Sequence, residues 1–454
     1  MDATADRTKG SGLEPVLTSS VDDDVANKKI VFRLRPGLVF HDGSTINADA
    51  VIWNYQRMID AGRLQFFNYF DKIEKIDDLT FQIRYKTYTN QLIQSWAWFF
   101  PRSKEAFDKG TGGSKDPIVQ RDWDETHLVG AGPFKLVEYV RDNHMTWTKF
   151  DKYWNKPLPY LDAVEIRYVP DPVTAQALME AGQADYWLNS PAASQAALFK
   201  KGFKKISGWV GLIDSVWPNT SDPASPWKDV RLRQAIDYAL DKAAIAKAVG
   251  LGLYVPLFQL APPGEWGYDP KYPERKYDPA KAKQLLTDAG YPNGIKTSMI
   301  VANDPFSQDA GTAIKQYLDA VGIQTTLDIA DPARFYGTVW GTAKPGLSFM
   351  WSGMDTTHLM TYMRWFSTDP FTNLVYLGRT DEQRKLDEAA KAIPDAEGQK
   401  TATMGLFKYL NDGAYLSPVL QRPSASIAQP YVHSQQFQQG FVRWQQELVF
   451  MDKH

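Results

Sequence analysis

The sequence predicts an α/β protein with more than one lobe. The chain has 454 residues, which is too long for one ordinary hydrophobic core and indicates two or three lobes. Its apolar fraction of 43% and its charged fraction of 23% are those of a globular protein. Between residues 296 and 352, strand patterns alternate with helix patterns, which is typical of parallel strands joined by helical crossovers.

The first part of the chain predicts a strand, a helix and a second strand. Residues 29–40 alternate apolar and polar side chains and break at Pro36-Gly37, as a half-buried strand does. Residues 47–60 place their apolar side chains on one helical face, with Asn47 as the expected N-cap. The next strand is predicted at 79–85.

A strand, a helix and a strand also follow one another further along the chain. They are predicted at 164–169, 171–182 and 184–188, and their spacing favours one βαβ unit. Asp229 and Asp241 each precede a periodic run, so we expect two successive helices there.

Proline and glycine crowd residues 256–294. We interpret this region as mostly surface connection around one helix at 278–290.

The block from 296 to 352 is the most informative. Strands are predicted at 296–303, 323–330 and 346–352, with helices at 309–322 and 332–341 between them.

Ligands of open parallel sheets bind beyond the carboxyl ends of the strands. We therefore expect Asn303, Asp331, Trp351, Met354 and Asp355 at or just past those ends. An indole with one polar edge suits an apolar cleft, although Trp351 as a cover over the core of its own lobe stays an alternative.

Charge and composition exclude several classes of partner. Lysine and arginine number 51 and the acids 53, a net charge of −2, so we expect no nucleic acid partner. Apolar runs such as 95–100 fall far short of the ~20 residues that a membrane-spanning helix needs. The start of the chain has no apolar run of a signal peptide, so we expect none on this chain.

Patterns of catalysis and of metal or cofactor binding are missing from the sequence. The chain has no cysteine, which excludes disulfides, thiolate nucleophiles and cysteine-ligated metals. Its six histidines never pair at helical metal spacing, and no G-x-S-x-G or phosphate-loop motif occurs. The segment 129–134 resembles part of a dinucleotide motif but runs into Pro133 instead of opening a helix. We therefore expect no catalytic residues, no metal and no cofactor.

Four segments resemble successive signatures of one family. They are FRLRPGLVFHDGSTINADAV (32–51), HLVGAGPFKLVEY (127–139), DKYWNKPLPYLDAVEIRYVPDPVTAQALMEAGQADYW (151–187) and PWKDVRLRQAIDYALDKAAIAKAV (226–249). Their order is that of the extracytoplasmic solute-binding proteins of bacterial ABC importers, family 5, which includes dipeptide, oligopeptide and nickel binders.

The resemblance implies two hinged lobes of the Venus-flytrap type, with an extra α/β subdomain on the first lobe. Residues 13–24 match a sequence motif that, in the family, follows a longer N-terminal segment of the mature chain. The usual N-terminal portion of lobe I is therefore expected to be absent here. By analogy, the crossings between the lobes are expected near 212–222 and 414–423. The implied ranges are 1–28 for a remnant of lobe I, 29–127 for the extra subdomain, 128–214 and 415–454 for lobe I, and 215–414 for lobe II.

The resemblance also bears on the ligand. Dipeptide binders of this family anchor the two charged termini with an aspartate and an arginine, at places that Met354 and Val301 occupy here. A buried charged terminus without a partner is costly, so a zwitterionic dipeptide should fit poorly unless Asp355 or Arg364 takes over.

We therefore expect a longer peptide held through its backbone, or a non-peptide such as an oligosaccharide or an opine-like conjugate stacked on tryptophan. Each candidate residue also has an alternative interpretation as a core residue, above all Trp98 in its apolar run. The candidate ligand-binding residues are Trp351, Trp340, Tyr362 and Trp98 as platforms, Asp355, Arg364 and Asn303 as polar contacts, and Met354 in the wall of the crevice.

The function that the resemblance implies is capture of a peptide or peptide-sized solute by a monomer in the periplasm or another extracytoplasmic space. Closure of the lobes would follow ligand binding, and the closed form would be presented to an ABC permease. A ligand sensor that docks on a receptor is an alternative of a different class. A hydrolase on a two-lobed scaffold is a more remote one.

Overall fold

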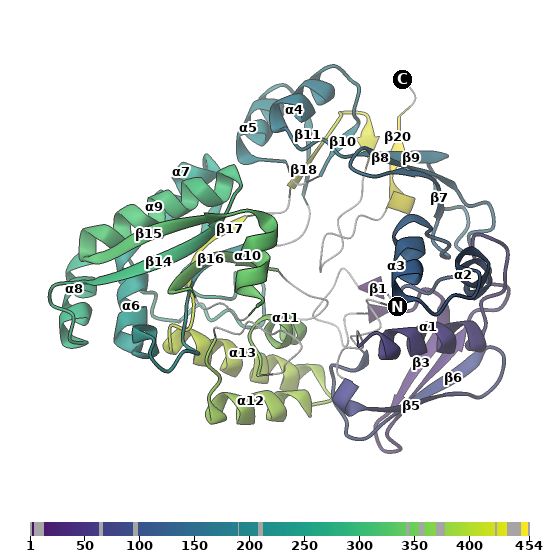
Figure 1. Ribbon diagram of the computed structural model, residues 1–454, viewed down its shortest axis with the longest axis horizontal. Coiled ribbons are helices and arrows are strands. Elements are labelled where there is room, and N and C mark those ends of the chain that lie inside the picture. The colour runs from purple at the N-terminus through teal and green to yellow at the C-terminus, as the bar shows by residue number, and fades with distance from the viewer. Residues whose placement is uncertain are drawn as a thin grey trace.

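The computed structural model describes residues 2–3, 13–62, 67–93, 99–188, 190–207, 212–341, 345–353, 358–368, 377–422, 425–433 and 446–452. Figure 1 shows its helices and strands in two groups around a central region. One group is built on a six-stranded sheet, and the sheets of the other group have two to four strands.

The N-terminal part of the chain forms what we call the subdomain. Its elements are β1 (Asp2–Ala3), β2 (Leu13–Glu14), β3 (Thr18–Asp24), β4 (Lys29–Leu34), α1 (Ala48–Asp60), β5 (Phe70–Lys75), β6 (Thr80–Tyr85), α2 (Lys104–Thr111) and α3 (Pro117–Thr126). Four strands form an antiparallel sheet in the order β3-β4-β6-β5. The predicted strands at 29–40 and 79–85 are confirmed, and Asn47 caps α1 because its side chain accepts from the Ala50 amide.

Smaller sheets follow the subdomain. Their elements, with the helices between them, are β7 (Phe134–Val140), β8 (His144–Lys149), β9 (Ala163–Arg167), α4 (Pro172–Glu180), β10 (Tyr186–Trp187), α5 (Ala192–Lys200), β11 (Lys204–Ser207), β18 (Ala425–Ala428), β19 (Val432–His433) and β20 (Phe450–Met451). The predicted βαβ unit is wrong, although its strand, helix and strand all exist. The strand β9 pairs antiparallel with β8, whereas β10 pairs antiparallel with β18 in another sheet.

A six-stranded mixed sheet organises the second group. Its order is β13-β17-β12-β16-β14-β15, and β14 runs parallel to both β15 and β16, whereas β12 is antiparallel to β16 and β17. The strands are β12 (Leu212–Pro218), β13 (Val255–Pro256), β14 (Ile295–Ala302), β15 (Ile323–Ala330), β16 (Leu347–Ser352) and β17 (Ser417–Arg422). The parallel strands predicted between 296 and 352 are therefore confirmed.

Eight helices with described bounds accompany this sheet. They are α6 (Val230–Ala239), α7 (Lys242–Gly250), α8 (Pro279–Asp288), α9 (Pro305–Val321), α10 (Pro332–Val339), α11 (His358–Trp365), α12 (Asp381–Lys391) and α13 (Ala396–Asp412). Asp229 and Asp241 cap α6 and α7 as predicted. Gly322, the last residue of the helix predicted at 309–322, caps α9 in the left-handed conformation with a φ of 98°.

Both faces of the six-stranded sheet are buried. Met299 and Val301 point into a core shared with α6 to α9, and Ile300 between them points into a core shared with α10, α11 and α13. A strand covered on both sides reads as a nearly continuous apolar run, which is why β16 and the second half of β14 were visible in the sequence.

The interpretation of 256–294 as mostly surface connection is wrong for its first third. Leu260 and Ala261 are fully buried in the core beneath α13, and the Leu260 amide donates to the Asn411 side chain over 3.0 Å. A Cβ atom on Gly267 would lie 2.3 Å from the ring of Phe407, so glycine is needed for this close approach. The predicted helix is confirmed as α8.

Two neighbouring passages of the chain link the groups. Between β11 and β12 the chain passes into the six-stranded sheet, and between β17 and β18 it returns. The strands that flank the two passages are paired on both sides, β11 with β18 and β12 with β17.

Candidate functional site

Strand ends converge along one edge of the six-stranded sheet, which we call the crossing edge. It is formed by the carboxyl ends of β14, β15, β16 and β17 and by the start of β12, as their pairing directions require. The chain enters and leaves the sheet here, so this edge faces the smaller sheets.

The crossing edge holds several of the predicted residues. Asn303, Asp331 and Trp351 lie at or just past the ends of β14, β15 and β16, as predicted. Met354 and Asp355 lie outside the described residues.

A buried ion pair joins the two crossing strands. Asp214 of β12 accepts two hydrogen bonds from the Arg422 guanidinium of β17, at 2.6 Å from Nε and 2.9 Å from an outer nitrogen. The Asp214 side chain is 2% exposed and that of Arg422 is 24% exposed. A bulge between Asp214 and Ser215 shifts the register here. The Arg422 guanidinium also lies over the ring of Phe306, 4.3 Å from its centroid.

Burial and charge oppose each other in this pair. Removal from water raises the pKa of the Asp214 carboxyl, and the nearby Arg422 charge limits that rise. Burial acts to lower the pKa of the Arg422 guanidinium, but the Asp214 carboxylate outweighs it and the pKa of Arg422 stays above its ordinary value. The two-point geometry therefore holds β12 and β17 together as an ionised pair.

Three indoles gather near the end of β16. The Trp351 ring meets the Trp365 ring edge-on, with centroids 5.3 Å apart, and the Trp340 ring lies 5.9 Å from the Trp365 ring. Trp365 is 2% exposed and its indole N–H has no acceptor among the described residues, whereas Trp340 is 39% exposed. The Arg364 guanidinium lies 5.7 Å from the Trp365 ring. Of the predicted residues, the structure thus brings Trp351, Trp340 and Arg364 together.

Asn303 and Asp331 are engaged with their own lobe. Asn303 is exposed. Its backbone amide donates to the Ala330 carbonyl, and its side-chain oxygen accepts a hydrogen bond from the Gln308 side chain. The Asp331 carboxylate caps α10 by accepting from the Arg334 amide over 3.0 Å. Asn303 retains an exposed amide group at the crossing edge.

Tyr362 corrects one prediction, and Trp98 lies outside the described residues. Tyr362 is fully buried and its hydroxyl accepts a hydrogen bond from the Gln383 side chain over 3.1 Å. Its ring packs between those of Phe366 and Phe407. Tyr362 is a core residue of this lobe because α11 turns its ring toward α12 and α13, so it is not a ligand platform in this conformation.

Sequence reasoning missed Asp214, Arg422 and Trp365. A signal for Asp214 exists, because it interrupts an apolar strand and a buried charge needs a partner. Arg422 ends β17 after a glutamine and carries no such signal. Nothing local marks Trp365, since its place among the indoles depends on where α11 packs.

A separate cavity of about 410 Å³ lies away from the crossing edge. It is lined by β9, α4 and β10 together with residues near the C-terminus, and includes Val164, Met179, Trp187 and Met451. None of the predicted ligand-binding residues contributes to it.

Within the described ranges, no three histidine or acidic side chains come together in a way that could hold a metal ion. No helix among the same residues is both long and apolar enough to cross a bilayer.

Comparison with known proteins identifies the relatives of this chain. The family model described as bacterial extracellular solute-binding proteins, family 5, middle region, matches residues 12–373. Glutathione-binding protein GsiB of Pectobacterium atrosepticum is 31% identical over 361 residues, which is 77% of this chain and 67% of that protein. Heme-binding protein A of Haemophilus influenzae is 29% identical over 351 residues, which is 70% of this chain and 62% of that protein.

Solved structures share the fold. The periplasmic binding protein AgaA of A. tumefaciens R10, in complex with agropinic acid, has a TM-score of 0.83 at 24% identity and covers 100% of this chain and 92% of its own. The oligopeptide-binding protein AppA of Bacillus subtilis, in complex with a nonapeptide, has a TM-score of 0.82 at 19% identity, over 99% and 92% of the two chains. The two groups of elements are therefore the two lobes of a periplasmic binding protein fold, with mixed α/β content.

Proposed function

Because this chain belongs to the bacterial extracellular solute-binding proteins of family 5, we propose that it captures a peptide or peptide-sized solute between its lobes and delivers it to an ABC permease. Family membership supports the transport role. A relative that is 31% identical is a glutathione-binding protein, and glutathione is a peptide, which supports the ligand class.

The observation that carries the proposal is the pair of adjacent passages between the lobes. Two neighbouring strands, β12 and β17, are locked to each other by the Asp214–Arg422 pair and leave the lobe at the same edge. Such a joint allows the lobes to rotate about a narrow axis while each stays rigid. A solute that contacts both lobes then shifts the population toward the closed form by its preference for that form.

The ligand contacts we propose lie at the crossing edge. Trp351 and Trp340 offer indole faces, Arg364 a positive charge, and Asn303 an exposed amide, with Met354 and Asp355 next along the chain. Val301, where dipeptide binders have their arginine, is fully buried in the core. A free dipeptide carboxylate would lack that partner, so we favour a longer peptide or a conjugate over a zwitterionic dipeptide.

The proposal needs no bond-making step and no cofactor. It places the protein outside the cytoplasm as a monomer, with lobe I over 128–214 and 415–454, lobe II over 215–414 and the subdomain over 29–127. The relatives carry names of binding proteins rather than of enzymes, in line with this proposal.

Ligand capture can be tested by thermal stability in a panel of glutathione, longer peptides, saccharides and opine-like conjugates, after native mass spectrometry of the purified protein. A binder at a hundredfold excess over its Kd stabilises the folded state by about 2.7 kcal/mol and raises Tm. We expect a peptide-sized compound to raise Tm and Trp351→Ala to abolish that rise. Trp147→Ala in β8, far from the crossing edge, should keep it.

Other outcomes decide against parts of the proposal. A saccharide alone raising Tm would overturn the peptide class, and an unchanged rise in Trp351→Ala would remove the proposed site. Conversion of a compound to products, seen in the mass spectrum, would favour a hydrolase over a binding protein.

A further inference from the structure

The lobes also touch where the subdomain meets α11 and α12. Figure 1 shows these helices at the end of their lobe, with α12 beside the β5 side of the subdomain. Because the chain passes between the lobes elsewhere, this contact is not imposed by the connections.

The loop after β6 caps α12 from the other lobe. The Asn90 amide donates to the Lys391 carbonyl over 2.9 Å, and the Asn90 side-chain nitrogen donates to the carbonyls of Ala390 and Ile393, each over 2.8 Å. The last carbonyls of a helix have no partner within the helix itself, so an amide from another element satisfies them. Asn90 is 6% exposed and Lys391 is 3% exposed, so these hydrogen bonds are shielded from water.

An apolar contact accompanies the polar one. Met360 of α11 is fully buried in the subdomain core, which includes Phe32 and Phe81, whereas its neighbours Leu359 and Tyr362 belong to the core of their own lobe. One short helix therefore contributes to the cores of both lobes. Separation of the lobes would expose this methionine side chain to water, so the contact favours the arrangement in which the lobes touch.

A third contact joins the subdomain to α12. The hydroxyl of Tyr69, the residue before β5, donates to the Glu388 carboxylate over 3.3 Å, and the Lys391 ammonium lies 5.8 Å from the centroid of the Tyr69 ring.

We propose that Asn90 is a positioning residue for lobe closure: it holds α12 across the lobes, without being one of the proposed ligand contacts, and sets how much of the protein is closed. In this arrangement Asn90 donates three hydrogen bonds across the lobes, and opening would remove all three. The Ala390 and Ile393 carbonyls would keep the donors of their own lobe, the Ile393 amide and the Gln399 side chain. This inference rests on the two-lobed fold and not on the identity of any ligand.

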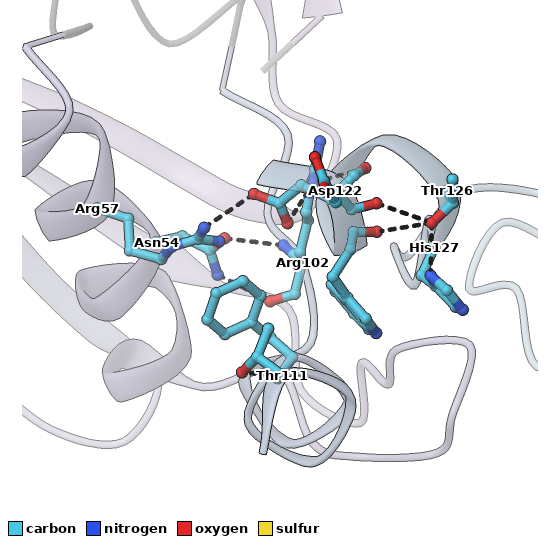
Figure 2. Close-up of polar contacts among 10 residues, drawn as sticks. Asn54, Arg57, Arg102, Thr111, Asp122, Thr126 and His127 are labelled. Atoms are coloured by element: carbon cyan, nitrogen blue, oxygen red, sulfur yellow. Dashed lines mark hydrogen bonds and ion pairs between the residues drawn. The ribbon is translucent and has the colours of Figure 1, made fainter. Parts of the chain in front are cut away.

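Asn54 provides a matched control within one lobe (Figure 2). Its side-chain nitrogen donates to the carbonyls of Ala50 and Arg102, each over 2.9 Å, and it is 7% exposed. Asn54 and Asn90 thus make the same kind of buried contact, but both acceptors of Asn54 lie in the subdomain.

The test uses the full chain without ligand. Because the chain has no cysteine, two introduced cysteines are the only thiols available for cross-linking. Thr87→Cys and Ala392→Cys place thiols at exposed positions beside the two sides of the Asn90 contact. A flexible bismaleimide should join them rapidly in this background. Adding Asn90→Asp removes two donors and sets a carboxylate against two carbonyls, so we expect the rate of cross-linking to fall by about tenfold and the radius of gyration to rise.

Adding Asn54→Asp should leave the rate and the radius unchanged at temperatures well below its melting midpoint, with circular dichroism confirming the fold. Met360→Ala, which introduces no charge, should slow cross-linking in the same direction as Asn90→Asp. Equal rates of cross-linking in the Asn90→Asp and parent backgrounds would overturn the proposed role of Asn90 in lobe closure. Since no ligand is added, that result would leave the proposed solute capture standing.

Discussion

The six-stranded sheet and the three-stranded sheet β7-β8-β9 use similar residues in different surroundings. In β12, Val216 and Trp217 point to opposite faces and both are fully buried, whereas Val137 of β7 is 62% exposed. Helices cover both faces of the larger sheet, and the smaller one has no strand that is buried throughout. Layering, rather than strand composition, decides how much each apolar side chain contributes.

An ion pair in each sheet makes the same point. Arg422 and Asp214 approach to 2.6 Å, as do Arg167 and Glu165 of β9. The first pair has side-chain exposures of 24% and 2%, the second of 51% and 44%. Loss of one partner should therefore cost more stability in the first pair, although the two distances are identical. Only the first pair would leave a buried charge without a partner.

The largest effect is expected from Trp217→Ala. This change empties a fully buried site and removes the hydrogen bond from the indole to the Met350 carbonyl, so we expect a loss of about 3–5 kcal/mol in unfolding free energy. The matched change in the smaller sheet, Trp147→Ala, affects a partly exposed ring and should cost less than half as much. Denaturant unfolding followed by circular dichroism measures both, and equal losses would break the comparison.

The second effect concerns the ion pairs. Arg422→Leu leaves the Asp214 carboxylate buried without a partner and should cost about 3 kcal/mol, whereas Arg167→Leu should cost at most about 1 kcal/mol. Adding Asp214→Leu to Arg422→Leu should restore much of the stability, because the stranded charge is gone. No recovery in the double variant would mean that the cost comes from lost packing.

The smallest effect is a pH dependence at the junction of the subdomain and the smaller sheets. The His41 ring contacts the Gly132 carbonyl over 3.0 Å and meets the Phe150 ring edge-on, and burial lowers its pKa. The nearby Lys135 lowers this pKa further, whereas the Gly132 carbonyl and Asp42 oppose the shift.

The direction of this pH dependence follows from the number of protons that the folded and unfolded states bind. Below about pH 6.5 the unfolded chain protonates His41 while the folded chain resists, so stability is complete above that pH and falls as the pH drops toward the lowered value. In His41→Gln the decrease in unfolding free energy between pH 7 and pH 5 should be smaller. An equal decrease would show that His41 is not a source of the acid sensitivity.

Local patterns predicted many elements because their causes are local. Asn47, Asp229 and Asp241 cap helices through their own neighbouring amides, and Gly322 ends α9 because it adopts a positive φ. Among the parallel strands from 296 to 352, β16 was visible because burial on both faces leaves a nearly continuous apolar run. The same logic placed Asn303, Asp331 and Trp351 at strand ends.

Local patterns could not predict contacts between residues that are distant in the sequence. Short strands such as β9 and β10 carry no mark of the sheet they join, which is why one βαβ unit was expected where two sheets exist. Tyr362 looks like any exposed aromatic residue until α12 and α13 pack over it.

By itself, the sequence determined the presence of many helices and strands, several of their caps, the alternation that builds the large sheet, and the family. Only the tertiary structure decided that Asp214 meets Arg422, that three indoles share one place, and that Asn90 caps a helix of the other lobe. The physical reason is range: propensities, caps and periodicity act within a few residues, whereas burial and pairing depend on which distant segments pack together.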